Sequence, residues 1–451
     1  MIKKEIYRFR IIPGLFTLFI IMSLSGLRIT ANAQMGHVLS GVGAIDQGWS
    51  GAGTANPQDV LGALHWNPAA ITHQDRSSFN VNLQMLTPNG RLYSGVKANA
   101  FGPMGPQQDL SGNTESKSGN FAIPAIAFVY QPRESDFTFG FHAFGVGGFG
   151  VDYVSTPTNP ITTPQPPNGM GFNAINSEFM LMQMAPTVAY KISDMLSIAV
   201  SPVANLSTLE VNPFPATNPD DSNGDGFPSY PGGPREMAWG FGYQIGINIG
   251  DVNGLRFGAS YKSNQRFEDF KFTADSENGS PRSFNFNLDY PMITSAGLGY
   301  SGFERLELAA DVKYIDFEHT HGFDKVGFDQ SGAVQGFGWK SIWVIAAGIQ
   351  YDVTDKLPVR LGYSYNENPI SDANSFYNVS APAIIQHHLS AGFSYRINPQ
   401  LTGSFAIQYG LKNSTRGEWM NPQMGGAVPN TYVKNELSTR FIALGLCYHF
   451  K

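Results

Sequence analysis

The sequence predicts an all-β protein: a transmembrane antiparallel β-barrel of about 14 strands, plugged by an N-terminal hatch. Three observations predict it. Segments of about ten residues alternate apolar and polar side chains along most of the chain. The connections between them alternate between short turns and long polar loops. Glycine (50 residues) and aromatic residues (13%) are abundant while charged residues make up 14%, which suits many short strands with one face in lipid.

Residues 1–33 have the features of a secretory signal peptide. A basic region precedes an apolar stretch at 11–24, and Ala31-Asn32-Ala33 forms a small-x-small cleavage site. Gln34 is therefore the expected first residue of the mature chain. The single cysteine, Cys447, excludes an internal disulfide and a cysteine-rich metal site, and we expect no cofactor.

The mature chain is acidic. Removing residues 1–33 takes away five basic residues and one acidic residue, which changes the formal net charge from −6 to −10. This charge argues against nucleic acid as a partner. After position 33 no apolar stretch is long enough for a membrane-spanning helix. An exported chain of this kind is expected in the outer membrane of a Gram-negative bacterium.

Strict alternation begins at Ser77, where the barrel of residues 77–451 is expected to start. Along 77–88, apolar residues point one way (Phe79, Val81, Leu83 and Met85) and polar residues the other (Asn80, Asn82 and Gln84). A period of two residues is the signature of a strand. In a membrane barrel the apolar face meets lipid and the polar face lines the lumen.

Fourteen such segments follow one another, at 77–88, 119–130, 137–149, 178–191, 195–211, 237–250, 254–272, 284–301, 306–317, 340–352, 358–366, 386–397, 401–411 and 436–450. Six short turns alternate with seven long loops, at 89–118, 150–177, 212–236, 273–283, 318–339, 367–385 and 412–435. Bacterial outer-membrane barrels have short periplasmic turns and long external loops. The pattern therefore places both ends of the barrel on the periplasmic side.

Aromatic residues support this orientation. Strands that approach the short turns end in tyrosine, at Tyr130, Tyr190, Tyr300, Tyr351, Tyr395 and Tyr448. Tyrosine at one level is typical of an interfacial girdle. The aromatic last strand, 436–450, is similar to the signal that the barrel-assembly machinery reads. We expect that machinery and outer-membrane lipid as partners, and a monomeric barrel.

The segment before the barrel, residues 34–76, is the candidate plug. It is rich in Gly and Ala, and its Asn67-Pro68-Ala69 favours a turn before the first strand. Small residues let a backbone fold tightly and lie close to surrounding walls. On composition alone, a flexible glycine-rich linker is an equal alternative. Fourteen strands enclose more space than side chains fill, which favours the plug.

The order of small residues here resembles the N-terminal hatch of the FadL/TodX (OMPP1) family, outer-membrane transporters of long-chain fatty acids and hydrocarbons. The matching positions are Ser40, Gly41, Gly43, Gly48, Ser50, Gly51, Gly53, Ala55, Asp59, Asn67, Pro68 and Ala69. The resemblance continues in outline through 358–370 and 388–397. It implies capture of a hydrophobic solute by external loops, binding in an apolar lumen, movement of the hatch and lateral exit through a gap where the third strand kinks.

The third strand ends in a glycine cluster that contains Gly145, Gly147 and Gly148. Clustered glycine weakens strand pairing and marks bends or bulges. The alternative is an ordinary glycine-rich strand end that leads into a loop. With the resemblance, we expect these residues to form the kink beside the lateral opening.

Lys340 is the candidate ligand-binding residue. Strand parity places it inside the barrel, and the pair Trp339-Lys340 matches an aromatic-Lys pair of the family. A cation in an apolar lumen suits a fatty carboxylate. The alternative is an ion pair with Glu307 or Asp311, which parity also places inside.

One external loop resembles a calcium loop in part. Asp221, Asn223 and Asp225 offer oxygen ligands at alternate positions, but an EF-hand needs Glu at its twelfth position, where Gly232 stands. A solvated loop without metal is the expectation.

Three functions compete. A transport channel for hydrophobic solutes needs a hatch and no catalytic groups, so we expect no enzyme activity. An outer-membrane lipid hydrolase would need a Ser/His pair, and neither a nucleophile-elbow motif nor a local Ser/His/Asp grouping stands in the sequence. A structural or adhesive barrel would act through its loops. The small-residue plug favours the channel.

Overall fold

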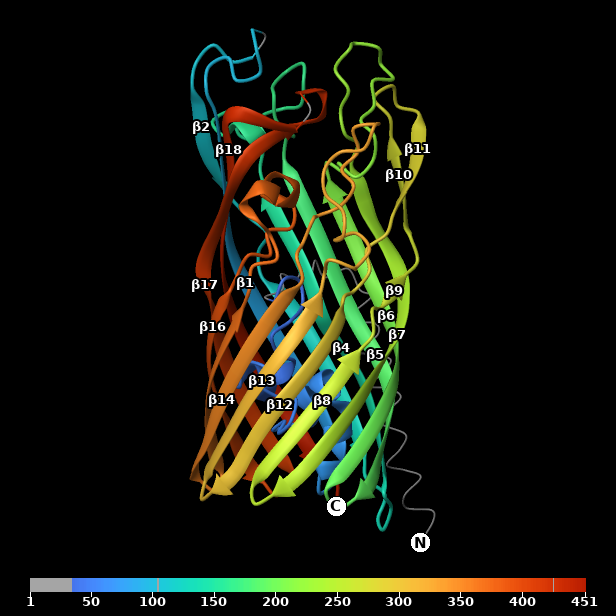
Figure 1. Cartoon of the computed structure of the whole chain (residues 1–451), viewed down its shortest axis with the longest axis vertical. Coiled ribbons are helices and arrows are strands. Elements are labelled where there is room, and N and C mark those ends of the chain that lie inside the picture. The colour runs from blue at the N-terminus through green and yellow to red at the C-terminus, as the bar shows by residue number, and fades with distance from the viewer. Residues whose placement is uncertain (1–34, 104, 425) are drawn as a thin grey trace.

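The computed structural model describes residues 35–103, 105–424 and 426–451. Within them, fourteen antiparallel strands form a closed barrel, with β18 paired to β1 from Ser78–His449 to Val96–Thr431. Figure 1 shows the short turns at the lower end, beside the C-terminus, and the long connections at the upper end. The predicted fold class is confirmed. The predicted signal peptide lies outside the described residues.

The barrel strands in chain order are β1 (Ser78–Val96), β3 (Phe121–Tyr130), β4 (Phe137–Tyr153), β5 (Ile175–Ser193), β6 (Leu196–Asn212), β7 (Gly233–Val252), β8 (Leu255–Lys262), β12 (Met292–Phe303), β13 (Leu306–Asp316), β14 (Ile342–Thr354), β15 (Leu357–Asn366), β16 (His387–Asn398), β17 (Leu401–Asn421) and β18 (Gly426–His449). Two short strands, β2 (Leu110–Glu115) and β9 (Arg266–Phe267), add to the same sheet. The hairpin of β10 (Phe270–Asp275) and β11 (Pro281–Phe286) forms a sheet of its own in the connection between β8 and β12.

Apolar and polar side chains alternate along the strands because, as predicted, one face points outward and the other into the barrel. On β1 the side chains of Val81 and Leu83 are 44% and 45% exposed on the outer face, whereas Asn82 and Gln84 are buried inside. An apolar outer face is what a strand in lipid requires.

Several predicted boundaries are wrong, among them that of the predicted loop 89–118, into which β1 continues as far as Val96. The predicted strand 254–272 stops at Lys262, and the predicted strand 284–301 begins only at Met292, because the residues between form the separate β10–β11 hairpin. The predicted loop 412–435 is mostly strand: β17 and β18 continue to Asn421 and from Gly426. The buried face of that hairpin mixes apolar Trp419 and Val433 with polar Thr415 and Asn435, so the apolar-polar alternation that marks the lower strands is absent there.

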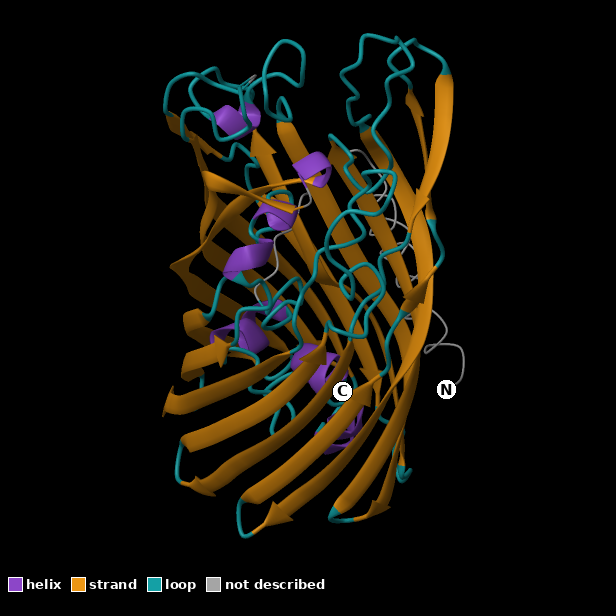
Figure 2. Cartoon of the chain, turned by 45° about the horizontal axis from the view of Figure 1, so that its top comes forward, coloured by secondary structure: helices purple, strands orange, loops and turns teal. Residues whose placement is uncertain are grey.

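The hatch lies inside the lower half of the barrel (Figures 1 and 2). It contains α3 (Gly43–Gly48), α4 (Val60–Trp66) and the 3-10 helix η1 (Pro68–His73). Short 3-10 helices η2 (Pro160–Thr162), η3 (Asp372–Asn374), η4 (Phe376–Asn378) and η5 (Pro422–Met424) lie in the external connections. None of the helices in the described residues has both the length and the hydrophobicity that crossing a membrane requires.

Candidate functional site

Asn67 fixes the hatch to the wall of the barrel. Its side-chain amide donates to the carbonyl oxygens of Thr54 (2.8 Å) in the hatch and Ile247 (2.9 Å) in β7, and its Oδ1 accepts from the amide of Ala69 (3.2 Å). Pro68 begins η1 directly after it, where a missing N–H costs nothing. The predicted Asn67-Pro68-Ala69 turn is therefore an anchor point.

The predicted hatch glycines lie where the hatch folds on itself. Gly43 and Gly51 have φ angles of +83° and +75°, which side chains with a Cβ rarely adopt. A Cβ at Gly41 would lie 3.0 Å from the Asp46 backbone, and one at Gly53 would lie 3.2 Å from the Asp46 carboxylate. These four glycines thus let the chain wrap around Asp46.

Asp46 is the buried centre of that wrap. Its Oδ2 accepts from the amide of Val42 (2.8 Å) and the indole N–H of Trp66 (3.2 Å). Burial, and then the charge of nearby Asp59, raise the pKa of Asp46 to about 8. Asp59 also caps α4, since its side chain accepts from Gly62 N (2.9 Å).

A buried ion pair joins the hatch to β13. Lys313 Nζ lies 3.0 Å from Asp311 Oδ2, donates to the Gly51 carbonyl (2.7 Å) and stands 4.0 Å above the ring of Trp66. Asp311 also accepts from Thr54 N and Oγ1. Parity predicts that Asp311 faces inward, but sequence gives no signal that its partners are hatch residues.

The hatch rests on glycines of the wall. A Cβ at Gly348 would lie 2.6 Å from the Trp49 ring, and one at Gly362 would lie 2.7 Å from Ser50 N.

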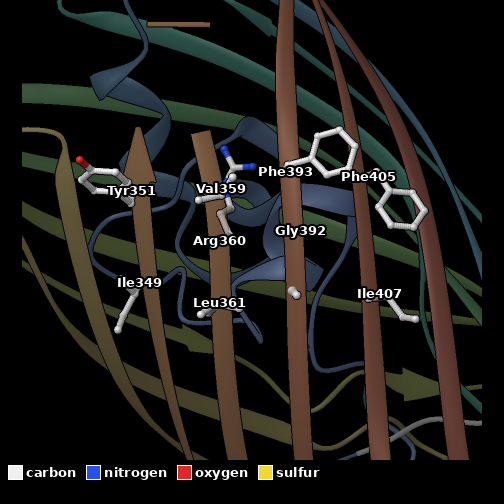
Figure 3. Close-up of a pocket in the computed structure, with 10 residues that line it drawn as sticks. Ile349, Tyr351, Val359, Arg360, Leu361, Gly392, Phe393, Phe405 and Ile407 are labelled. Atoms are coloured by element: carbon white, nitrogen blue, oxygen red, sulfur yellow. The ribbon is translucent and has the colours of Figure 1, made fainter. Parts of the chain in front are cut away.

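On the outer face of the same strands, β14 to β17, an apolar groove of about 390 Å³ is lined by residues that include Leu361, Phe393 and Ile407, with the hatch behind the strands (Figure 3). The β15–β16 ladder beneath it is continuous, so this groove faces lipid and does not open into the lumen.

The wall has a gap between β3 and β4. Their ladder ends at Ala125–Phe144, and above it the register of β4 on β5 shifts between Gly145 and Gly147. From His142 onward nearly every residue of β4 is buried, so the alternation is lost where the strand bends inward. The structure thus places predicted Gly145, Gly147 and Gly148 at this irregular stretch.

Hatch residues fill this gap. The amide of Leu39 donates to Val146 O (2.9 Å), and the amide of Gly148 donates to His37 O (3.0 Å). The side chain of Leu39 packs in one apolar cluster with Phe121 and Ile123 of β3. The hatch N-terminus therefore replaces β3 as the partner of β4 at this level.

His37 points into a cage of five aromatic rings. Its ring centroid lies 4.9 Å from Phe323, nearly parallel (8°), and 5.4 to 5.9 Å from four further rings, those of Phe179, Tyr290, Phe317 and Trp339. Both ring nitrogens lack a hydrogen-bond partner among the described residues. Burial lowers the pKa of His37 to about 3, so the ring is neutral. No sequence signal indicated this cage, because its rings come from distant segments.

Trp339, and not Lys340, is the buried member of its pair. The indole N–H of Trp339 donates to Asn378 Oδ1 (2.6 Å), while Lys340 is exposed. The alternation of side chains along β14 does not determine which way Lys340 points, because β14 begins at Ile342. The role of Lys340 in ligand binding stays a prediction. Glu307, a partner considered for it, accepts from the hatch side chains of Asn56 and Gln58.

An apolar pocket of about 50 Å³ lies between the external connections. Its lining includes Phe172, Tyr230, Phe328 and Phe376, each from a different connection.

Two candidate chemical sites are incomplete. Asp221 and Asp225 lie near Glu277, and one oxygen of each falls within 4.8 Å of the others, but Asp221 and Asp225 are exposed. Buried Ser364 Oγ lies 3.3 Å from His388 Nδ1, and His388 Nε2 has no hydrogen-bond partner among the described residues. A catalytic triad would need an acidic group at that second nitrogen.

Comparison with known sequences gives two matches. The family model for outer membrane protein transport proteins (OMPP1/FadL/TodX) matches residues 28–450. A 47 kDa outer membrane protein of Pasteurella multocida (strain Pm70) is 36% identical over 93 residues, which are 20% of this chain and 21% of that protein. That second match spans about a fifth of the relative's length.

Solved structures share the fold over nearly the whole chain. A Pseudomonas aeruginosa FadL homologue has a TM-score of 0.70 at 15% identity and covers 92% of this chain and 100% of its own. The P. putida toluene transporter TodX has a TM-score of 0.67 at 17% identity, with 91% and 99% covered. The Ralstonia pickettii toluene transporter TbuX has a TM-score of 0.65 at 17% identity, with the same coverage. With the family model matched over residues 28–450 and a plugged 14-strand barrel in place, the chain belongs to the OMPP1/FadL/TodX family of outer-membrane transport proteins.

Proposed function

We propose that this channel takes up hydrocarbons or long-chain fatty acids by loop capture, lumen binding, hatch movement and lateral exit. The structural neighbours TodX and TbuX are toluene transporters, and a third neighbour is a FadL homologue, which supports this solute class. The apolar pocket between the external connections supports capture at the cell surface.

The observation that carries the proposal is the wall gap that hatch residues close. Above Ala125–Phe144, β4 bonds to the backbone of residues 37–39 and not to β3. Backbone groups within a membrane must be paired. A gap whose backbone partner is a separate segment can open without unfolding the barrel, because only that segment has to move.

Lateral exit also has an energetic reason. A solute that entered the periplasm would lose about 0.8 kcal/mol of favourable burial for each methylene exposed to water. A solute that leaves through the gap between β3 and β4 stays in an apolar environment throughout. The apolar residues Leu39, Phe121 and Ile123 line this route.

A disulfide across the gap tests the proposal. Leu39→Cys with Ile123→Cys, in a Cys447→Ser background, ties the hatch N-terminus to β3, since Leu39 and Ile123 share one cluster. We expect the oxidised protein to lose solute uptake and the reduced protein to regain it. Uptake of a labelled hydrocarbon or fatty acid by cells measures both states of one variant, so misfolding cannot explain the difference.

The matched control ties the hatch body instead. Ser50 Oγ and Ser390 Oγ lie 2.8 Å apart, so Ser50→Cys with Ser390→Cys can form a disulfide that leaves residues 35–39 free. This variant should transport equally in both redox states. Normal uptake by the oxidised Leu39/Ile123 pair would show that solute does not leave through the gap.

A lipid hydrolase is less well supported, because the pair formed by Ser364 and His388 is buried and His388 Nε2 lacks an acidic partner among the described residues. A structural or adhesive barrel would not need residues 37–39 in the gap. We keep outer-membrane lipid, the barrel-assembly machinery and a monomeric state as proposals.

A further inference from the structure

The strands that meet where the barrel closes carry more basic than acidic residues. β1, β2, β17 and β18 together contain five Lys or Arg residues and three Glu residues, namely Arg91, Lys412, Arg416, Lys434 and Arg440 against Glu115, Glu418 and Glu436. We call the five cations the external basic patch. The chain as a whole carries a formal net charge of −6, so the patch is opposite in sign to the protein.

The external basic patch begins where the lipid-facing surface ends. On the outer face of β18, Leu446, Leu444 and Ile442 are 55%, 58% and 37% exposed, and the next outward residue is Arg440. Arg440 pairs with exposed Tyr409 of β17, and tyrosine is typical of the boundary between lipid and head groups. The other four cations lie farther toward the external end, where Figure 1 labels β2 and β18. The patch therefore lies at the level of the external head groups.

The charged side chains of the patch point away from the barrel. On β18, Val433 and Asn435 are buried, and the amide of Asn435 donates to Ser375 O (2.9 Å) inside. Side chains alternate between the two faces of a strand, so Lys434 and Glu436 point outward. The surface they form meets the surroundings of the barrel and not its lumen.

Two cations of the patch lie directly opposite each other. Arg416 of β17 is the cross-strand partner of Lys434 of β18. Like charges at directly opposite positions destabilise a sheet. Glu436 is shared, since the Nζ atoms of Lys434 and Lys412 lie 3.2 and 3.4 Å from its two oxygens. Among the described residues, neither Arg416 nor Arg440 forms an ion pair with a carboxylate, so this surface lacks anions.

Aromatic rings hold two of these cations in place. Arg416 Cζ lies 4.2 Å from the ring centroid of Tyr432, and Lys434 Nζ lies 4.9 Å from that of Tyr93. Cation–π contacts of this kind are favourable. A side chain that is already ordered loses less conformational freedom when it binds an anion. The two cations are therefore prepared for a ligand between them.

The basic character is confined to this side of the barrel. On β7 and β14, exposed Trp239 and Trp343 lie beside carboxylates: Glu268 accepts from Trp239 N (3.1 Å), and Glu367 accepts from Trp343 N (2.9 Å). Acidic groups thus stand next to the aromatic residues on the other wall. A cationic belt that served only for general contact with the membrane would not be limited to one side.

We propose that the external basic patch binds the phosphorylated head group of a glycolipid in the external leaflet of the outer membrane. Arg and Lys bind phosphate through charge-assisted hydrogen bonds, and basic clusters beside a membrane recognise anionic lipid. A phosphate between Arg416 and Lys434 replaces their repulsion by two attractions. The site lies on the outer wall, so it goes beyond transport and depends only on the position of the barrel in the outer membrane.

Binding of lipid A to the purified full-length protein in detergent, without divalent cations, tests the proposal. Each cation at a lipid surface contributes about fivefold in affinity, so Arg416→Gln with Lys434→Gln should bind lipid A about thirtyfold more weakly than the wild type. Native mass spectrometry measures the bound fraction during the titration. Heat-modifiable gel mobility shows that each barrel is folded.

The matched control makes the same charge change on the other wall. Arg266 and Lys271 are exposed there, and Arg266→Gln with Lys271→Gln should leave the affinity for lipid A unchanged. Charge-preserving exchange in the patch, Arg416→Lys with Lys434→Arg, should retain binding.

A stability measurement separates a binding role from a structural one. Without lipid, Arg416→Gln with Lys434→Gln should melt at the temperature of the wild type or above it, because the like-charge pair is gone. With lipid A, the wild type should gain more thermal stability than this variant. A purely structural role would lower the melting temperature of the variant in both conditions.

The inference is overturned if the folded Arg416→Gln, Lys434→Gln protein binds lipid A as tightly as the wild type, or if the control variant loses as much affinity. Equal binding of dephosphorylated lipid A would assign binding to the acyl chains and reject the head-group site. Displacement by an equal concentration of inorganic phosphate would assign the site to a free anion and also reject it. These results are independent of the disulfide across the gap, which tests transport alone.

Discussion

The carbonyl oxygen of His37 accepts a hydrogen bond from the amide of Gly148 at 3.0 Å, so one hatch residue contributes its side chain to the lumen cage and its backbone to the barrel wall. An unpaired amide at membrane depth is costly, which makes the docked segment the resting state. Under the proposed function, opening therefore needs an interaction that compensates for the loss of this hydrogen bond.

Acid should release the hatch N-terminus. Burial holds the pKa of His37 at about 3, whereas a released imidazole titrates near 6.5. The released state therefore binds the proton, and stability of the docked segment is present above pH 6.5 and lost as pH falls toward 3. The rate of hydrogen exchange at residues 35–39, corrected for intrinsic rates, should rise about tenfold when the pH falls from 7.5 to 5. His37→Phe should show no such rise; the same rise in that variant would assign the effect to another group.

Breaking the buried ion pair between Lys313 and Asp311 of β13 should lower the stability of the protein more than removing both charges. Lys313→Met leaves the carboxylate of Asp311 buried without its cation, at a cost of about 3–5 kcal/mol. Lys313→Met combined with Asp311→Asn should cost less than the single lysine change, since no buried charge remains. Thermal denaturation of the three proteins provides the comparison. A double variant that is less stable than Lys313→Met would contradict the buried-pair account.

Asn67→Ala should loosen the hatch while the barrel stays closed. The change removes the donor to Thr54 and Ile247, at a cost of about 1–3 kcal/mol. Exchange should rise in α4 and η1 and remain slow in the β1–β18 ladder. Gln58→Ala, at a half-buried position near the hatch surface, is the control and should have a smaller effect. Equal exchange in wild type and Asn67→Ala would remove the anchor role.

Protease added to intact cells should cut external connections and spare periplasmic turns. The connection 213–232 is long and exposed at 221–228, whereas the turns at 194–195 and 399–400 lie at the opposite end. Mass spectrometry of the fragments identifies the sites. Residues 412–421 and 426–435 should resist cleavage, because they are paired strand. Cuts confined to the turns at 194–195 and 399–400 would reverse the assigned orientation.

Strand faces were predictable because lipid and lumen impose opposite demands on successive residues. That logic holds for Val81 and Asn82 and for the inward Asp311. It fails at residues 412–421 and 426–435 of the β17–β18 hairpin, where the buried face mixes apolar Trp419 and Val433 with polar Thr415 and Asn435. It also fails at Lys340, because parity applies only inside a strand and β14 begins two residues later.

The hatch was predictable in outline, and its contacts were not. Small residues at Gly43 and Gly51 indicate tight folding, and the structure shows positive φ at both. The cage around His37 depends on rings from positions as distant as Phe179 and Trp339, which only the closed barrel brings together. A sequence carries no local period for such a contact. A single histidine between Gly36 and Val38 gave no reason to single it out.

The seam between β1 and β18 has a consequence for biogenesis. Nineteen residue pairs join these strands, and β1 begins five residues after η1 ends at His73. The hatch is thus tethered to a strand of this seam, and Gly246 and Gly258 of the wall approach the hatch so closely that neither has room for a Cβ. We expect the plug to be seated before the first and last strands meet, so that the N-terminal segment serves as a template for closure of the cylinder.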